Sequence, residues 1–180
     1  MNWNQWQSLS DDCVKELPYQ VADWLLEFGS LTEKLNRHSK NPVKLDLLLQ
    51  APGTIASSEQ QAMATDANQL PQREVVLYAN DKPWIFARTI VSEESQQLIE
   101  QLGQQPLGSI LFNNEHLRRQ FLQIKKTFPE DELYQKAVQH LDHCSQEFLW
   151  ARRSLWNNQH QEKRYALLVN EVFLPASPLY

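Results

Sequence analysis

The sequence predicts an α+β fold: a single antiparallel β-sheet with helices on one face. Two observations lead to this prediction. Apolar residues near the N-terminus recur with the period of a helix, whereas several later segments alternate apolar and polar residues, as half-buried strands do. Helices come first along the chain, and strands mixed with helices follow. The length of 180 residues suits one domain spanning residues 1–180.

The first predicted helix covers residues 21–28. Its apolar stripe, with the spacing i, i+3, i+4 and i+7, consists of Val21, Trp24, Leu25 and Phe28. Gly29 follows where such a helix is expected to stop. Ser30 and Glu33 then have capping-box spacing, so a second short helix should begin at once, with Leu31 at the elbow between the two.

The strands are predicted from alternation and from turn residues. Residues 43–49 predict a half-buried strand, and residues 51–71, rich in small and polar side chains, predict a long loop. Residues 72–91 predict a hairpin whose tight turn is Asn80-Asp81.

The rest of the chain predicts a second strand pair and two more helices. The strands are residues 148–156 and 165–174, joined by a polar turn at 157–164. The helices are residues 92–103, with Ser92 as the cap, and residues 129–143.

Composition excludes several classes of function. The formal net charge is −5, and a surface for nucleic acid would need a clustered excess of Lys and Arg, so no nucleic-acid partner is expected. No stretch approaches the roughly 20 apolar residues of a membrane span, and no secretory leader is visible, so no stable membrane insertion is expected. Two distant cysteines and the lack of a long apolar seam predict a cytoplasmic monomer.

Two arginines stand out in the predicted hairpin. If Ala79 pairs with Lys82 across the turn, regular alternation places Arg73 directly opposite Arg88 on an otherwise apolar face. Like charges in this position repel each other, and carboxylates between them would relieve the repulsion, which points to an acidic ligand. The alternative is structural: one arginine pairs with a protein carboxylate while the other reaches water.

Glu171 is the corresponding oddity on the last predicted strand. It shares a face with Tyr165, Leu167, Val169 and Phe173, and it is the one ionised residue on that face. A carboxyl group on an apolar wall can serve as an acid or a base near neutral pH. The alternative is an ordinary buried Glu–Arg pair.

Other chemistry has weaker support. His140, His143 and Cys144 lie close together but lack a second cluster with zinc-site spacing, so no metal site is expected. The basic stretch at residues 118–126 is interpreted as a solvated face. With four glycines and no phosphate loop, and with no G-x-S-x-G elbow, neither a cofactor nor a serine nucleophile is expected.

Five segments resemble the chorismate pyruvate-lyase family, and they occur in the family's order. The most specific is the C-terminal segment EVFLPASPLY, residues 171–180. The others are REVVL (73–77), ARTIV (87–91), QPLG (105–108) and LWARRS (149–154).

The resemblance implies a carbon–oxygen lyase that converts chorismate to 4-hydroxybenzoate and pyruvate, the first committed step of ubiquinone biosynthesis, with product inhibition. It implies a ligand site beneath helical flaps, without metal or cofactor. Matched residue by residue, Arg73 and Arg88 bind the substrate and act in catalysis together with Glu171. Leu107 and Leu31 belong to the flaps and contact the ligand, and Leu31 stands where a familiar member carries Met.

Two other functions remain as alternatives. A non-catalytic carrier or sensor of aromatic acids such as 4-hydroxybenzoate would share the fold and both arginines, but it would gain little from Glu171. A structural interaction module would bind no small molecule at all. The mechanism expected for the lyase has Arg73 on the ring carboxylate, Arg88 on the enolpyruvyl carboxylate and Glu171 near the 4-hydroxyl.

Overall fold

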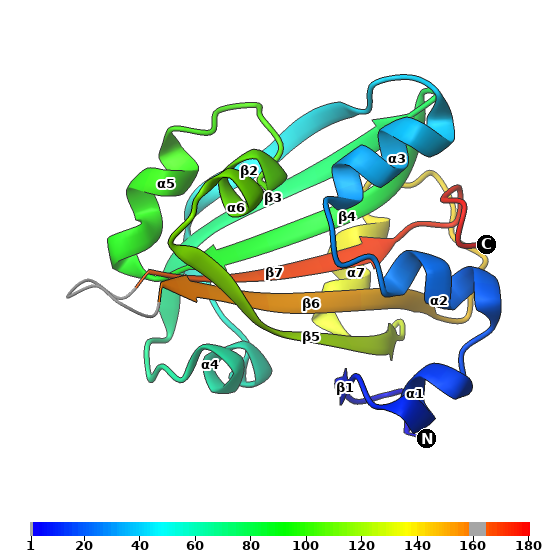
Figure 1. Cartoon of the computed structure of the whole chain (residues 1–180), viewed down its shortest axis with the longest axis horizontal. Helices are drawn as coiled ribbons and strands as arrows, with labels where there is room; N and C mark the ends of the chain where they lie inside the picture. Colours follow the sequence, from blue (N-terminus) through cyan, green and yellow to red (C-terminus); the bar gives the residue numbers. More distant parts are fainter. Residues whose placement is uncertain (1, 159–164) are drawn as a thin grey trace.

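The computed structural model describes residues 2–158 and 165–180 and contains one seven-stranded sheet (Figure 1). The strands are β1 (Gln7–Ser8), β2 (Lys44–Thr54), β3 (Gln69–Ala79), β4 (Lys82–Val91), β5 (Leu117–Thr127), β6 (Leu149–Asn158) and β7 (Ala166–Phe173). Their order is β1-β5-β6-β7-β4-β3-β2, and every neighbouring pair is antiparallel. The α+β prediction with an antiparallel sheet is confirmed.

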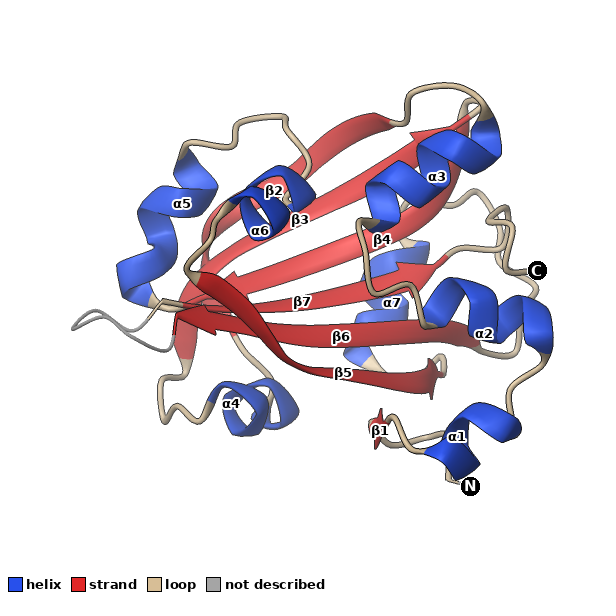
Figure 2. Cartoon of the chain, in the orientation of Figure 1, coloured by secondary structure: helices blue, strands red, loops and turns tan. Residues whose placement is uncertain are grey.

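Helices cover both faces of this sheet (Figure 2). They are α1 (Asp11–Lys15), α2 (Tyr19–Leu25), α3 (Leu31–Ser39), α4 (Ser57–Met63), α5 (Gln96–Glu100), α6 (Gly108–Asn113) and α7 (Glu132–Val138). Helices α2, α3, α5 and α6 pack on one face, here the front face, and α4 and α7 pack on the back face. The expectation of helices on one face alone is therefore wrong, because the strands present apolar residues on both sides. Among the described residues, no helix is both long and apolar enough to span a membrane.

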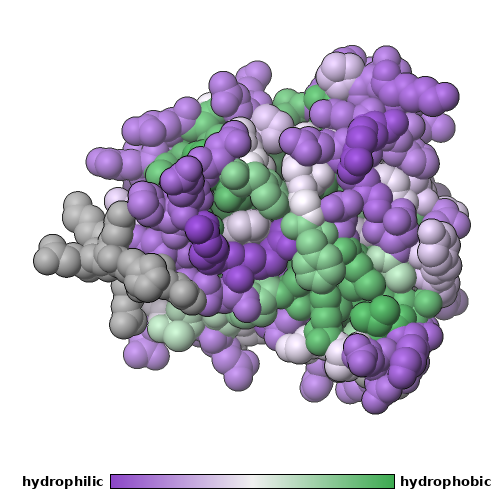
Figure 3. Space-filling view, viewed as in Figure 1, coloured by the Kyte–Doolittle hydropathy of each residue, from purple (hydrophilic) through white to green (hydrophobic). Residues whose placement is uncertain are grey.

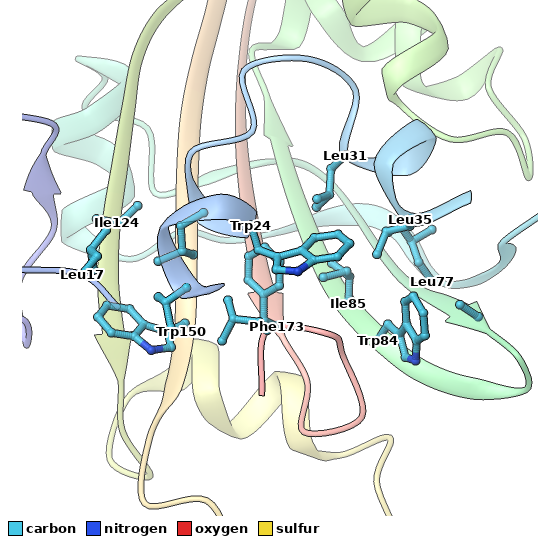
Figure 4. Close-up of a cluster of buried hydrophobic side chains, with 14 of the residues drawn as sticks. Leu17, Trp24, Leu31, Leu35, Leu77, Trp84, Ile85, Ile124, Trp150 and Phe173 are labelled. Atoms are coloured by element: carbon cyan, nitrogen blue, oxygen red, sulfur yellow. The ribbon is translucent and has the colours of Figure 1, made fainter. Parts of the chain in front are cut away.

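The main core lies between the front face and helices α2 and α3 (Figure 4). Trp24 and Leu25 of α2 and Leu35 of α3 are nearly or fully buried, and they meet Ile85 and Phe173 of the sheet. Burying side chains of this size contributes roughly 1.5–3 kcal/mol each, so this cluster fixes the two helices on the sheet.

The two predicted N-terminal helices exist, with one correction. Helix α2 ends at Leu25, and Phe28 lies beyond it with 61% of its surface exposed, so Phe28 does not extend the apolar stripe. The backbone N–H of Glu33 donates to Ser30 Oγ at 3.3 Å, which confirms Ser30 as the cap of α3. Leu31 is the first residue of α3 and is buried.

The hairpin has its predicted turn but not its predicted register. Ala79 pairs with Lys82, and Asn80 and Asp81 have φ values of 51° and 59°, as a type I′ turn requires. A β-bulge then shifts the pairing between Leu77 and Tyr78. One extra residue turns every later side chain of β4 to the other face. Arg73 therefore pairs with Thr89, not with Arg88, and the predicted Arg73–Arg88 pair is wrong.

Several elements were missed or misplaced by the sequence analysis. Residues 51–71 are not a long loop, because they contain the end of β2, all of α4 and the start of β3. The sequence did not predict Pro52 to be a strand residue because proline lacks the N–H that a strand donates. The structure tolerates Pro52 because β2 is an edge strand. Residues 118–126, which the sequence analysis interpreted as a solvated basic face, belong to strand β5. Helix α7 is shorter than predicted, and residues 159–164 of the predicted turn lie outside the described residues.

Candidate active site

A cavity lies between the front face of the sheet and two roof segments. The first roof segment is residues 29–32, which include the start of α3, and the second is residues 106–112, which include most of α6. The polar side chains on the sheet side are Arg73, Thr89, Arg119, Arg152, Ser154 and Glu171. Apolar residues from five strands and from the roof fill the spaces between them. A mostly apolar wall with a few convergent charges is typical of a small-molecule site.

Arg73 on β3 is anchored in this cavity and is only 2% exposed. Its Nη2 donates to the carbonyl oxygens of Gly103 and Gln105, each at 3.0 Å. Its Nε is buried without a hydrogen-bond partner, and Arg73 makes no ion pair among residues 2–158 and 165–180. Burial lowers the pKa of this guanidinium from its usual value. A buried cation with a free donor is well suited to bind an anion.

Glu171 on β7 faces the same cavity and forms an ion pair with Arg152 on β6. The two residues are direct neighbours across the strands, and Arg152 Nε lies 2.6 Å from Glu171 Oε2. Arg152 Nη1 also donates to the carbonyl oxygen of Glu27 at 2.8 Å. The Glu–Arg pair considered as the structural alternative is thus present, but it lines the cavity, so the two interpretations are compatible.

Arg88 lies on the back face and is not brought into this cavity. Its Nη1 lies 2.6 Å from Glu74 Oε1 and its Nε lies 3.3 Å from Glu59 Oε1. Burial lowers the pKa of Arg88, but these two carboxylates outweigh burial and raise it. The structural alternative proposed for one of the two arginines, pairing with protein carboxylates, describes Arg88. Its position follows from the bulge in the hairpin.

Leu31 and Leu107 both lie in the roof, one in each segment. The segments meet at Gly108, where an added Cβ would lie 3.2 Å from Ser30 Oγ. The structure therefore brings together Arg73, Glu171, Leu31 and Leu107. Movement of the roof segments as flaps stays a prediction.

Arg119 and Arg152 are the charged cavity residues that the sequence analysis did not single out. Arg119 belongs to the basic stretch interpreted as solvated, because strand β5 was not recognised. With the strand assigned, Arg119 falls opposite Trp156, and alternation along β6 then puts Arg152 and Ser154 on the same face. Arg152 lies in the LWARRS segment, for which the family resemblance implied no residue role.

The weak metal candidates lie elsewhere. His140 stacks on Phe86, with ring centroids 6.1 Å apart, and the Tyr134 hydroxyl donates to Cys144 Sγ at 3.4 Å. In the part of the chain that the structure describes, no group of three or more His, Cys, Asp or Glu residues is placed to hold a metal ion.

Comparison with solved structures finds bacterial proteins of similar fold and low sequence identity. The chain is similar to the effector domain of PhnF from Mycobacterium smegmatis, with a TM-score of 0.60, 13% identity and coverage of 82% of this chain and 89% of that one. It is also similar to gene product SA0254 from Staphylococcus aureus, with a TM-score of 0.55, 15% identity and coverage of 82% and 89%. At this identity the likeness concerns the fold alone.

Comparison of the sequence is more specific. The chain is 35% identical to a chorismate pyruvate-lyase of Hamiltonella defensa over 97% of this chain and 87% of that protein. It is 34% identical to a chorismate pyruvate-lyase of Pectobacterium atrosepticum over 91% and 82%. The family model described as chorismate lyase matches residues 1–180. The chain therefore belongs to the chorismate lyase family.

Proposed function

We propose that this protein is a carbon–oxygen lyase that eliminates pyruvate from chorismate and leaves 4-hydroxybenzoate. Family membership supports the reaction, and the cavity supports its chemistry. The observation that carries the proposal is the placement of Arg73 and Glu171 on one largely apolar wall beneath the roof segments. An anchor for an anion and a carboxylate for proton handling thus line one cavity.

The reaction asks little of the protein beyond geometry and one proton. The bond between the ring and the enolpyruvyl oxygen breaks, and the ring carbon that carries the hydroxyl loses its hydrogen as a proton. The ring thereby becomes aromatic. The departing enolpyruvyl group gains a proton and becomes pyruvate. Electrons balance without an external oxidant or reductant, so the reaction needs no redox cofactor. Catalysis then comes from holding a reactive conformation and positioning the proton acceptor.

Each cavity residue has a role in this mechanism. Arg73 binds the ring carboxylate, because its fork is fixed by two carbonyl oxygens and its Nε points to no protein acceptor in the described chain. Glu171 accepts a hydrogen bond from the 4-hydroxyl end and assists proton transfer there, and Arg152 is the positioning residue that holds Glu171. Leu31 and Leu107 cover the apolar ring from the roof.

The cellular setting proposed for the enzyme follows from this chemistry. The product 4-hydroxybenzoate would enter ubiquinone biosynthesis, and the substrate would be a small anion of the cytoplasm. The formal net charge of −5 supports an enzyme without a nucleic-acid partner. We expect a monomer, and sedimentation at two protein concentrations tests this expectation.

The decisive experiment mixes purified protein with chorismate in buffer containing a chelator and follows both products by chromatography. Equal molar amounts of 4-hydroxybenzoate and pyruvate would establish the lyase. Tight binding of 4-hydroxybenzoate without any turnover of chorismate would instead favour the carrier or sensor, and neither binding nor turnover would favour an interaction module.

A further inference from the structure

The charges that line the cavity do not balance. Three arginines face it, Arg73, Arg119 and Arg152, and the acidic lining residue is Glu171. Glu171 pairs with Arg152, which leaves two guanidinium groups that form no ion pair within the described ranges. The wall therefore carries an excess of two positive charges. Arg73 is buried and Arg119 is half-buried, and a charge removed from water without a partner is disfavoured. A ligand with two negative charges is therefore the natural complement.

Arg119 is held in a fixed orientation by aromatic side chains. Its guanidinium carbon lies 4.5 Å from the centre of the Trp156 ring and 5.9 Å from that of Phe112. Its Nη1 donates to the carbonyl oxygen of Phe28 at 3.0 Å, while its Nε is buried without a partner in residues 2–158 and 165–180. Burial and the nearby charge of Arg152 lower the pKa of Arg119 and outweigh the opposite effect of the Glu171 and Glu27 carboxylates. A stacked, preorganised fork with a spare donor binds a carboxylate with little further ordering.

Strand register places Arg119 across the cavity from Arg73. Arg73 pairs with Thr89, Thr89 with Val169, and Val169 with Ser154, so one row of small side chains crosses the sheet from β3 to β6. Arg119 lies on β5 beyond the end of this row and pairs with Trp156. Four strand spacings separate the two arginine backbones, about 19 Å in a flat sheet. Both long side chains reach inward from these positions, and the first part of β5 curves toward α6 (Figure 1).

We propose that Arg119 is a specificity-determining residue that binds the second carboxylate of the substrate, the one on the enolpyruvyl side chain. This inference rests on the proposed function and deepens it. Arg73 then binds the ring carboxylate. Glu171 lies on β7 two residues beyond Val169, in the row of cross-strand neighbours next to the row that contains Arg73 and Thr89. The product 4-hydroxybenzoate keeps only the ring carboxylate. Cleavage therefore transfers the Arg119 contact to pyruvate, which leaves as a separate molecule.

The test compares two ligands that differ in one charge. 3-(Carboxymethoxy)-4-hydroxybenzoate carries both carboxylates on an aromatic ring, and its side-chain primary amide has nearly the same shape with one carboxylate. Dissociation constants for both are measured by calorimetry on the full chain. We expect the wild type to prefer the acid over the amide by about 10- to 100-fold, as for a hydrogen-bonded charge pair.

Variants assign this preference to a residue. Arg119→Gln should reduce the preference to less than about threefold. It should change the 4-hydroxybenzoate affinity by no more than about threefold, since 4-hydroxybenzoate has no second carboxylate for Arg119 to bind. Arg118→Gln, on the exposed neighbouring position of the same strand, is the matched control and should keep the preference. Arg119→Met keeps the packing on Trp156 and Phe112 and replaces Arg119→Gln if thermal melting shows the latter unfolded.

The inference is overturned by any of three results. The first is equal affinity of the wild type for the acid and the amide. The second is a folded Arg119 variant that keeps the preference, and the third is a variant whose affinity for 4-hydroxybenzoate falls as much as its affinity for the acid. The last result would mean that Arg119 acts through the roof. Chorismate turnover by the wild type is measured separately: a preference that depends on Arg119 without turnover would overturn the proposed reaction and leave the two-carboxylate site standing.

Discussion

Glu171 and Arg152 are positioned by the sheet itself rather than by a loop. They pair directly across β6 and β7, so their relative geometry is fixed by strand register. Arg152 also donates to the carbonyl oxygen of Glu27, in the connection that leads into the first roof segment. A change in Glu171 can therefore alter the chemistry without moving the backbone that carries it. This is the arrangement that precise positioning of a proton acceptor requires.

We expect Glu171→Gln to lower kcat for chorismate by about 10²- to 10⁴-fold, the usual contribution of a positioned acid or base. The substitution keeps the size of the side chain and removes its charge. Steady-state kinetics below the melting temperature measure the effect, and Glu94→Gln, at an exposed position, serves as the control. Normal turnover in a folded Glu171→Gln protein would exclude a catalytic role for this carboxylate.

Arg73 and Arg88 should behave differently when each is changed to Gln. Arg73→Gln removes the proposed carboxylate anchor, so the affinity for 4-hydroxybenzoate should fall by about 10- to 100-fold. Calorimetric titration with 4-hydroxybenzoate checks this prediction. An unchanged dissociation constant would show that the ring carboxylate binds elsewhere in the cavity.

Arg88→Gln should act on stability instead. It breaks the back-face ion pairs with Glu59 and Glu74. Glu74 keeps its ion pair with Lys136, whereas the buried Glu59 loses its cationic partner, which lowers the free energy of unfolding by about 3 kcal/mol. Denaturant unfolding measures the loss, and the KM for chorismate of the folded fraction should match that of the wild type. A raised KM with unchanged stability would restore the role in the site that the resemblance implied for Arg88.

The sequence could predict Arg73 and Glu171 but not their correct partners. Alternation within one strand assigns a face to each residue from nearby neighbours alone, and this was enough for Glu171. The pairing of Arg73 depended on the register between two strands, and one bulged residue reversed the face of Arg88. Arg119 was missed because its strand, β5, has few strictly alternating apolar residues and carries its own bulge after Arg119.

At the scale of elements, the start of α7 is organised by one carboxylate. Asp131 Oδ2 accepts hydrogen bonds from the backbone N–H of Phe128 at 2.9 Å and from Thr127 Oγ1 at 3.0 Å, and it pairs with Lys125 Nζ at 2.9 Å. Burial alone would raise the pKa of Asp131, but the N–H of Phe128 and the charge of Lys125 outweigh it and lower the pKa. The end of β5 and the helix α7 are thereby joined at a single residue.

Asp131→Ala should lower the free energy of unfolding by about 2 kcal/mol near pH 7, because the hydrogen bonds of this carboxylate to Phe128 and Thr127 and its ion pair with Lys125 are lost together. Because the folded pKa lies below the unfolded one, this contribution is fully present above the unfolded pKa and disappears as the pH falls through the folded pKa. Urea unfolding of wild type and variant across that range checks the sign. A stability gap that stays constant down to about pH 2 would contradict the assignment.

The elements that were predicted well share strong local signals. Helix α3 has its cap in the sequence, and the turn at Asn80-Asp81 requires positive φ values that these residues tolerate. Helix α4 and the outer part of β2 carry no such signals, and they depend on contacts with distant parts of the chain. Glu59 of α4, for example, is fixed by Arg88 and Asn170 across the back face.

At the scale of the whole molecule, the site joins parts of the chain that are far apart in sequence. The two roof segments, residues 29–32 and 106–112, touch at Gly108, while the charged floor comes from β3, β5, β6 and β7. The face of the molecule seen in Figure 3 is largely hydrophilic, with a large apolar patch where α2 lies and a smaller one where α6 lies. Ligand binding is therefore expected to tie the two roof segments to one another.

Hydrogen exchange tests this expectation directly. Saturating 4-hydroxybenzoate should slow amide exchange in α3 and α6 together, because both close on the same ligand, while α7 on the back face should be unaffected. Protection of only one roof segment would contradict a shared enclosure. Uniform protection of the whole chain would indicate general stabilisation by mass action instead.

The order of the strands also has a consequence for behaviour at high concentration. The sheet is open, with β2 at one edge and β5 at the other for most of its length, because β1 pairs with it only at Gln123 and Ile124. Both outer strands contain a bulge, and they carry Lys44, Asp46 and Pro52 on one edge and Arg118 on the other. Interrupted, charged edges are poor templates for a strand from another molecule. The irregularity that turns Arg119 toward the cavity therefore also protects the protein against aggregation through its edges.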